Sequence, residues 1–248
     1  NSLTFQDRKN IIKYLGESHL PLEKFIIGTG STSLNEAVDI CSYALEAGFN
    51  KLLMLPPYYY KNPTEGGLYS FFNHLVKKIS ENAPKIFLYN FPQMTTIPFS
   101  LELVERLRKK HPGIFVGMKD SSGDFANTVS FISAFNDFAA FSGSEEFINK
   151  NLANGGYGCI SASTNLTAPI VDRSLREESS REKDVLLQKA IAVRKIVSKK
   201  QIISGIKGCL SILKGDQAWR RTLPPIEEME SKESLELFNE INQIYPLK

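Results

Sequence analysis

The sequence Ile-Phe-Val-Gly-Met-Lys-Asp, residues 114–120, decides how the rest of the chain is interpreted. Its first five residues are apolar or glycine, which is typical of a buried strand, and the run then ends on Lys119. Period-two alternation predicts that Phe115, Gly117 and Lys119 share one face of this strand. Lysine is among the residues least often buried, so a strand that ends on one requires an explanation.

A Schiff-base amine is one explanation for Lys119. A desolvated amine can attack a ketone, and the resulting iminium accepts electrons from the neighbouring carbon. Gly117, which has no side chain, is predicted to leave room beneath the amine for a small molecule. The alternative is a lysine whose ammonium group reaches solvent at the strand end. The local sequence leaves both interpretations open.

Short apolar runs alternate with amphipathic helical patterns along most of the chain. Besides residues 115–119, the runs predicted as strands are 25–29, 51–56, 86–90, 138–142 and 158–162. The helices predicted between and after them are 34–47, 68–79, 101–110, 147–152, 185–197, 202–213 and 235–244. Regular strand–helix units favour a parallel sheet covered by helices, and the chain then ends in helices alone.

Six predicted strands fit two architectures. An open doubly wound sheet accommodates six, whereas a closed β/α barrel needs eight. A barrel without its first two strands would also have six. Nothing in the sequence resembles a linker that would divide the chain.

Composition excludes several classes of function. The 248 residues carry a formal net charge of +3 with both signs interspersed, which argues against a nucleic-acid partner. No apolar stretch is long enough to cross a bilayer, so no membrane partner is predicted. The cysteines and histidines lack metal-binding spacing, and the scattered cysteines (Cys41, Cys159 and Cys209) predict reduced thiols in a cytoplasmic protein.

Two further strand ends carry candidate site residues. Tyr89 ends the run 86–90, so on a barrel it would neighbour Lys119 and relay protons; alternatively it is a core tyrosine. Three consecutive tyrosines, residues 58–60, follow another strand and suit a pocket, a subunit contact or a packed loop.

Gly28-Thr29-Gly30-Ser31-Thr32 resembles the start of a dinucleotide fingerprint, but the third glycine is absent and no acidic residue ends the next strand. A tight strand-to-helix turn explains this segment without a nucleotide.

The combination of motifs resembles the dihydrodipicolinate synthase and N-acetylneuraminate lyase family, which are class I aldolases that form a Schiff base with pyruvate. The matching segments run in the same order and spacing over roughly the first 165 residues. They are Gly28–Gly30, Pro57–Tyr59 with Glu65–Tyr69, Tyr89–Pro92, Gly117–Asp120 and Gly155–Asn165.

The resemblance implies a TIM (β/α)8-type barrel with a C-terminal helical extension. Residues 1–165 would hold strands 3–8 of the family pattern, and residues 166–248 the last barrel helix and the extension, in one structural unit. It also implies a homo-oligomer, either a dimer or a tetramer.

The resemblance further implies roles for individual residues. Lys119 would form the imine, Tyr89 would relay protons, and Tyr59 would reach the site of a neighbouring subunit. The carbonyl group of Ile160 would position the pyruvyl unit, with Ser161 nearby. No metal or organic cofactor would be required, because the covalent imine on Lys119 is the electron sink.

Two departures from the family pattern shape the expectations. Residues 1–4 align with what normally follows the second strand and its Thr-Thr-Gly-Glu loop. We therefore expect the first two strands and that loop to belong to a longer chain or a separate piece. The alternative is an incomplete barrel with impaired chemistry. Second, Met94 stands where the synthase branch has a carboxylate-binding arginine, and methionine cannot form that bidentate pair.

These features predict a lyase that acts on a carbon–carbon bond next to a pyruvyl unit. A 2-keto-3-deoxy sugar acid is favoured as substrate, with a polar aldehyde partner that Thr95, Ser161 or Ser163 would contact. Alternatives are dihydrodipicolinate synthase, sialic acid cleavage, a dehydratase using the same imine, a catalytically impaired relative, and a nucleotide-binding open sheet.

Overall fold

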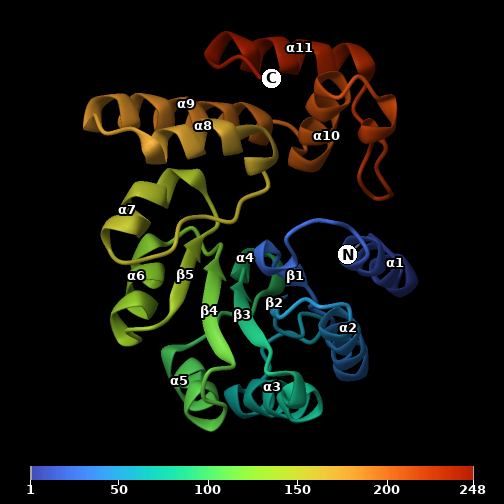
Figure 1. Cartoon of the computed structure of the whole chain (residues 1–248), viewed down its shortest axis with the longest axis vertical. Helices are drawn as coiled ribbons and strands as arrows, with labels where there is room; N and C mark the ends of the chain where they lie inside the picture. The colour runs from blue at the N-terminus through green and yellow to red at the C-terminus, as the bar shows by residue number, and fades with distance from the viewer. Residues whose placement is uncertain (1, 248) are drawn as a thin grey trace. The chain divides into compact units, whose positions relative to one another are not determined.

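A computed structural model describes residues 2–247 of the chain. By their internal contacts these residues form two compact units, residues 3–159 and residues 160–247 (Figure 1). The first unit contains the sheet, and the second is entirely helical. The sequence-based boundary at residue 165 and the single structural unit stay predictions.

The sheet of the first unit is wholly parallel, with the strands in sequence order and no reversal. A doubly wound sheet would reverse its strand order at a switch point, so this order favours the barrel-type arrangement. The strands are β1 (Ile27–Gly28), β2 (Lys51–Met54), β3 (Lys85–Asn90), β4 (Phe115–Asp120) and β5 (Ala139–Ser142). Each lies within one or two residues of a predicted run.

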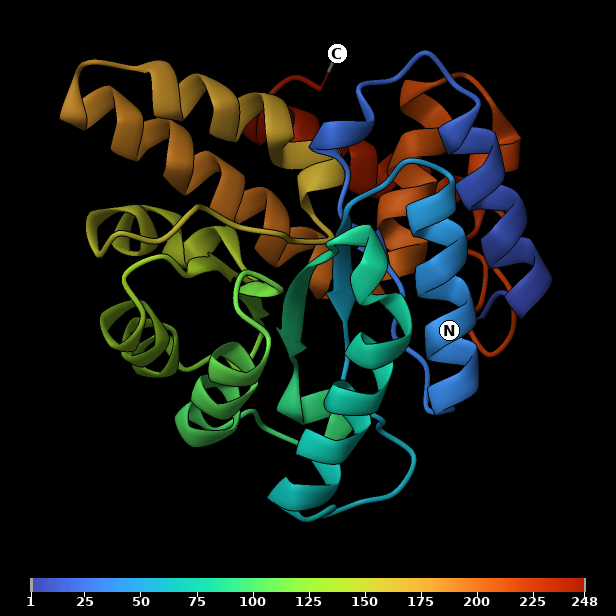
Figure 2. The ribbon, with the colours of Figure 1, turned by 60° about the horizontal axis from the view of Figure 1, so that its bottom comes forward.

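Helices alternate with these strands and pack against one another in sequence order. They are α1 (Phe5–Gly16), α2 (Leu34–Glu46), α3 (Glu65–Ile79), the short α4 (Pro92–Thr95), α5 (Leu101–Lys110), α6 (Phe125–Ala134) and α7 (Ile148–Ala153). Single 3-10 turns are η1 (Leu22–Lys24), η2 (Ser80–Asn82) and η3 (Glu145–Phe147). Figure 2 shows α2, α3 and α5 along the outer side of the strands.

Hydroxyl and carboxyl caps begin most of these helices. Thr4 and Asp7 form a full capping box at α1. Ser33 caps α2 by accepting a hydrogen bond from Glu36 N, and the carboxylate of Glu36 accepts one from the Ser31 hydroxyl at 2.9 Å.

The helix-facing side of the sheet forms the core of the first unit. Phe72 of α3 packs against Phe115 of β4 and Phe99, with ring centroids 6.0 and 5.7 Å away. Leu88 and Leu103 are fully buried in the same cluster. The opposite face of the strands, which carries Lys119, is only half-buried.

The sixth predicted strand, residues 158–162, does not form. A single parallel bridge joins Ser142 to Cys159. Gly158 has φ of 111°, a left-handed value that interrupts extended backbone. Two backbone hydrogen bonds join this segment to β5, from Ser142 N to Gly158 O and from Tyr157 N to Ala140 O, both at 2.9 Å. The buried Asn151 adds to them, because its Nδ2 donates to Ala140 O at 3.0 Å and to Gly158 O at 2.6 Å.

The second unit consists of α8 (Thr164–Arg176), α9 (Ser180–Ser198), α10 (Ile202–Leu213), the 3-10 turn η4 (Gln217–Arg220) and α11 (Ser231–Ile244). The helix pairs α8–α9 and α10–α11 are in contact, and α9 also contacts α10 and α11. These helices confirm the helical pattern predicted after residue 165.

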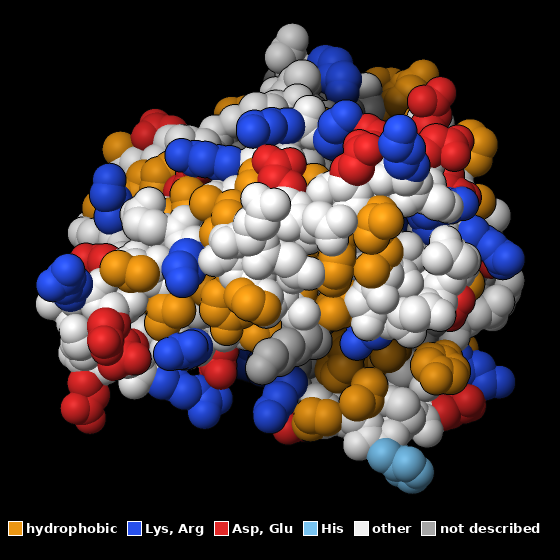
Figure 3. Space-filling view, turned by 90° about the horizontal axis from the view of Figure 1, so that it is seen from above, with side chains coloured by type: hydrophobic (Ala, Val, Ile, Leu, Met, Phe, Trp, Pro, Cys, Tyr) orange, Lys and Arg blue, Asp and Glu red, His pale blue; other side chains and the backbone are white. Residues whose placement is uncertain are grey.

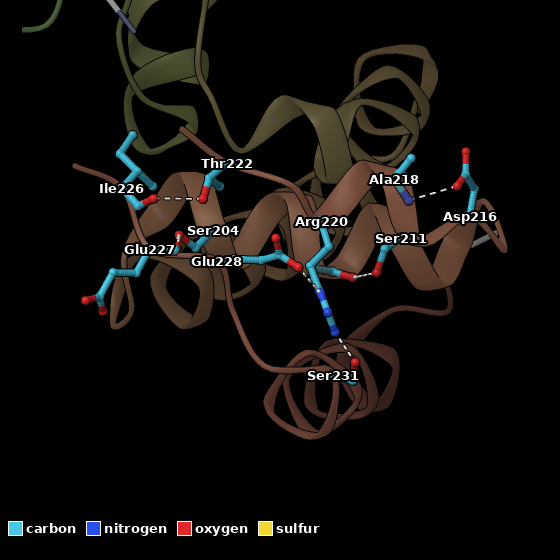
Figure 4. A network of polar contacts seen from close by, with 11 residues as sticks. Ser204, Ser211, Asp216, Ala218, Arg220, Thr222, Ile226, Glu227, Glu228 and Ser231 are labelled. Carbon is cyan, nitrogen blue, oxygen red and sulfur yellow. Dashed lines mark hydrogen bonds and ion pairs between the residues drawn. The ribbon is translucent and has the colours of Figure 1, made fainter. Parts of the chain in front are cut away.

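A polar network holds the long loop between α10 and α11 (Figure 4). Arg220 donates from Nε to Glu228 Oε1 at 2.8 Å and from Nη1 to the hydroxyl of Ser231, at the start of α11. Ser204 of α10 donates to the carbonyl oxygen of Glu227. The loop is therefore attached to both helices through side chains.

Charged side chains of both signs are interspersed on the face drawn in Figure 3. None of the helices within residues 2–247 is both long and apolar enough to cross a membrane.

Candidate active site

Lys119 and Tyr89 lie side by side at the carboxyl ends of adjacent strands. They are partners in the β3–β4 register, and Lys119 Nζ donates to the Tyr89 hydroxyl at 3.0 Å. The nitrogen also lies 4.1 Å from the centroid of the Tyr89 ring. That ring stacks on Phe91, and both Lys119 and Tyr89 are half-buried. The predicted adjacency is confirmed, and the lysine nitrogen is engaged by a phenol.

A register irregularity in β4 changes which residues share the face of Lys119. Phe115 pairs with Ile86, but Gly117 already pairs with Phe87, because the register shifts between them. Phe115 consequently lies in the helix-facing core, as its contact with Phe72 requires. The prediction that Phe115 shares a face with Lys119 is therefore wrong.

Gly117 does not leave room for a small molecule. A Cβ built on this residue would lie 2.3 Å from Ala139 O and 2.7 Å from the nearest atom of the Phe87 ring. The glycine instead permits close packing of β3 and β5 on either side of β4. The ring centroids of Phe87 in β3 and Phe141 in β5 lie 5.9 Å apart. The space predicted beneath the amine is filled by a packed aromatic layer.

We expect Gly117→Ala to lower the free energy of unfolding by about 1–3 kcal/mol, because backbone or ring atoms must move to admit the methyl group. Gly28→Ala in β1 is the matched control, since its Cβ would meet no atom within 4 Å. Its expected effect is within about 0.5 kcal/mol. Urea denaturation measures both, and equal midpoint shifts would contradict this explanation.

Asp120, the residue after Lys119, forms a buried polar centre that the sequence analysis did not identify as one. Its carboxylate is 4% exposed and accepts hydrogen bonds from Asn90 at 2.9 Å and Thr128 at 2.7 Å. Asn127 and the backbone N–H of Ser122 also donate to it. The signal available in the sequence was an acidic residue at the end of a buried strand.

Thr95 lies in α4 with 1% of its surface exposed. Its hydroxyl contacts Phe91 O at 3.1 Å and Ile97 O at 3.2 Å and accepts from Ile97 N. These contacts favour a local structural role over contact with a substrate.

Tyr59 lies on the surface, 73% exposed, with its ring edge-on to Tyr60 at 5.3 Å. Tyr60 is also exposed, so these two rings lie on the surface, whereas Tyr58 is half-buried.

Ile160 and Ser161 begin the second unit. Ser161 is 8% exposed, and its hydroxyl lies 2.9 Å from that of Ser163. Arg194 of α9 donates to both hydroxyls, at 2.8 and 3.0 Å. The sequence analysis missed Arg194, because α9 reaches this turn only through tertiary packing.

The glycine-containing turn at residues 28–32 shows no phosphate cradle. Thr29 and Ser31 are buried, and a Cβ on Gly30 would lie 3.0 Å from Leu55 N. The carboxylate of Glu36 binds Ser31 at the start of α2, where its negative charge disfavours a phosphate. The structural turn predicted as the alternative is the better description.

Two buried thiols have raised pKa values, and three cavities are lined by residues other than Lys119. Burial raises the pKa of Cys41 to about 11 and that of Cys209 to about 12, so both remain thiols near neutral pH. Cavities of about 360, 300 and 270 Å³ are lined by residues of α1 and α2, of the α3–α5 region, and of α8 and α9; Lys119 lines none of these three. Within residues 2–247, no three potential metal ligands cluster.

Comparison with known proteins gives one consistent family. The chain matches the model of the dihydrodipicolinate synthetase family over residues 2–244. It is 33% identical over 173 residues to 4-hydroxy-tetrahydrodipicolinate synthase of Rhodospirillum centenum, which covers 69% of this chain and 57% of that one. It is 27% identical over 187 residues to the 2-dehydro-3-deoxy-D-gluconate/2-dehydro-3-deoxy-phosphogluconate aldolase of Picrophilus torridus, covering 75% and 67%.

A solved structure extends the similarity to the fold. Dihydrodipicolinate synthase from Agrobacterium tumefaciens superimposes with a TM-score of 0.83 at 26% identity, covering 98% of this chain and 83% of that one. This likeness confirms the fold class, a TIM-type barrel fold with a C-terminal helical extension. The chain spans about half the length of curated relatives that it matches, 46% of one and 57% of another.

Proposed function

This chain belongs to the dihydrodipicolinate synthetase family of carbon–carbon lyases, and we propose that it is a class I aldolase whose Lys119 forms an imine with a 2-oxo acid. The observation that carries this proposal is the 3.0 Å contact between Lys119 Nζ and the Tyr89 hydroxyl. An amine and a phenol at adjacent strand ends supply a nucleophile and a proton carrier.

The reaction begins when the uncharged amine of Lys119 attacks the carbonyl carbon of the 2-oxo acid. A carbon–nitrogen bond forms, the nitrogen gives up one of its two protons, and the carbonyl oxygen takes up a proton to become a hydroxyl. A second proton converts that hydroxyl to water, which leaves as the C=N bond forms. Tyr89 exchanges these protons with the bound oxygen. The iminium then accepts the electron pair of the breaking carbon–carbon bond while the hydroxyl of the departing fragment gives up its proton, so an aldehyde departs and an enamine remains. Protonation of the enamine carbon and addition of water to the resulting iminium then release pyruvate and free the amine of Lys119.

The favoured substrate is a 2-keto-3-deoxy sugar acid. Met94 is 70% exposed on α4 and offers no charge to a second carboxylate, which supports a polar, uncharged aldehyde partner. The match to the Picrophilus torridus aldolase is in line with this choice. The alternative is 4-hydroxy-tetrahydrodipicolinate synthase, the activity named for the Rhodospirillum centenum relative.

In this proposal the protein is a cytoplasmic homo-oligomer, either a dimer or a tetramer. It uses no cofactor, because the covalent imine on Lys119 is the electron sink. The exposure of Tyr59 supports an oligomer in which this ring reaches a second copy. Ile160 and Ser161 would contact the 2-oxo acid.

Borohydride trapping tests the proposal. Pyruvate and borohydride added to the full chain should convert the imine to a stable secondary amine on the peptide that contains Lys119, detected by mass spectrometry. Modification of other lysines alone, or of none, would overturn the assignment. Release of pyruvate from 2-keto-3-deoxygluconate, compared with consumption of pyruvate and aspartate semialdehyde, then separates the two substrate classes.

A further inference from the structure

We propose that Asp120 is a positioning residue for the Lys119–Tyr89 pair, because its buried carboxylate joins the carboxyl ends of β3 and β4 and so sets the spacing of amine and phenol. This inference rests on the proposed function, since it is the imine chemistry of Lys119 that the spacing serves.

The carboxylate uses both oxygens. Oδ1 accepts from Asn90 Nδ2 at 2.9 Å and from Ser122 N at 3.0 Å. Oδ2 accepts from Asn127 Nδ2 at 2.9 Å and from Thr128 Oγ1 at 2.7 Å. Four donors from β3, the loop after β4, and α6 therefore converge on one buried group. A buried carboxylate satisfied in this way holds its neighbours in a single arrangement.

Asn90 transmits this arrangement to the β3 side. It is 1% exposed, follows Tyr89 directly, and pairs with Asp120 in the strand register. Its Oδ1 accepts from Phe99 N at 3.2 Å, so both ends of the amide are fixed. Asn90 and Asp120 thus form the rung next to the one occupied by Tyr89 and Lys119.

Backbone hydrogen bonds also connect the carboxyl ends of these strands. Ser121 N donates to Asn90 O at 2.8 Å, and Gly143 N donates to Asp120 O at 2.7 Å. These hydrogen bonds connect the end of β3 to the end of β4, and the end of β4 to the segment after β5. Successive strand residues point to opposite faces, so the Asp120 carboxylate acts on Lys119 through the backbone. Misplacement of a reacting group by 1 Å can cost about 100-fold in rate.

The test is the rate constant of pyruvate trapping in Asp120→Asn. The variant keeps the size of the side chain but replaces one carboxylate oxygen by an NH₂ group. That group cannot accept the hydrogen bonds that the oxygen accepts in the wild-type chain. We expect trapping at saturating pyruvate to slow about 10- to 100-fold, while the final extent per folded molecule is unchanged. A purely structural role would lower the extent in proportion to the folded fraction and leave the rate constant unchanged, which would overturn the proposal.

Asp124→Asn is the matched control. Asp124 lies in the same turn and caps α6 through Ala126 N at 3.0 Å. Its replacement should leave the trapping rate at the wild-type value. Equal slowing in both variants would overturn the role given to Asp120, because any lost carboxylate in this turn would then suffice.

Thr128→Val provides a milder variant should Asp120→Asn not fold. It removes one donor to Oδ2 and keeps a similar shape, so trapping should slow about two- to fivefold. An unchanged rate in Thr128→Val would then overturn the proposal. Absence of any adduct in the wild-type chain would instead defeat the proposed function itself, which keeps the two failures distinguishable.

Discussion

Replacing Lys119 by arginine is expected to abolish the pyruvate adduct and to reduce carbon–carbon lyase activity by at least about 10³-fold. Arginine keeps N–H donors and much of the side-chain length, but its guanidinium stays protonated and cannot attack a carbonyl carbon. A guanidinium N–H can still donate to the Tyr89 hydroxyl, as Lys119 Nζ does, so the fold should remain intact. Intact mass after borohydride reduction, with activity on the same samples, measures the effect.

Lys85→Arg is the control for this change. Lys85 lies at the opposite end of β3 and donates to Gly113 O at 2.9 Å through its amine. This variant should trap pyruvate as the wild-type chain does. A Lys119→Arg protein that still acquires the adduct would exclude Lys119 as the imine-forming residue.

Tyr89→Phe is expected to lower kcat by about 10²- to 10³-fold through loss of proton transfer. The ring would still stack on Phe91 and contact the amine of Lys119, so only the hydroxyl is removed. Because the phenol acts in the formation and the collapse of the intermediate, both trapping and turnover should slow. Single-turnover trapping and steady-state kinetics measure these two steps.

Tyr69→Phe controls for the loss of a tyrosine hydroxyl elsewhere. Tyr69 in α3 contacts Arg106 through its ring face, 4.5 Å from the guanidinium carbon, and that contact survives the change. Its kinetics should match those of the wild type. A Tyr89→Phe protein with unchanged kcat would show that another group carries the proton.

The adjacency of Lys119 and Tyr89 could be predicted because it depends on local pattern. Apolar runs gave the strands, and parallel strands in sequence order bring their carboxyl ends to one edge of the sheet. The helices after residue 165 were predictable for the same reason, since their apolar residues recur at helical spacing.

The errors arose where a single residue changes the geometry of its neighbours. The register shift next to Gly117 moved Phe115 into the helix-facing core, and the ring of Phe87 filled the space assigned to a ligand. At the sixth predicted strand, the positive φ of Gly158 interrupted the extended backbone, and only one bridge to β5 formed, supported by Asn151. Periodicity assumes regular backbone, so it cannot anticipate such breaks.

The sequence by itself determined the order of strands and helices, the lysine at the end of β4 and the tyrosine at the end of β3, because these follow from side-chain periodicity along a few residues. Only the tertiary structure decided that four donors from β3, the loop after β4 and α6 converge on Asp120, that Arg194 binds the Ser161 and Ser163 hydroxyls, and that Thr95 is buried. Those contacts depend on the directions of side chains from segments brought together by packing, and no local pattern encodes such directions.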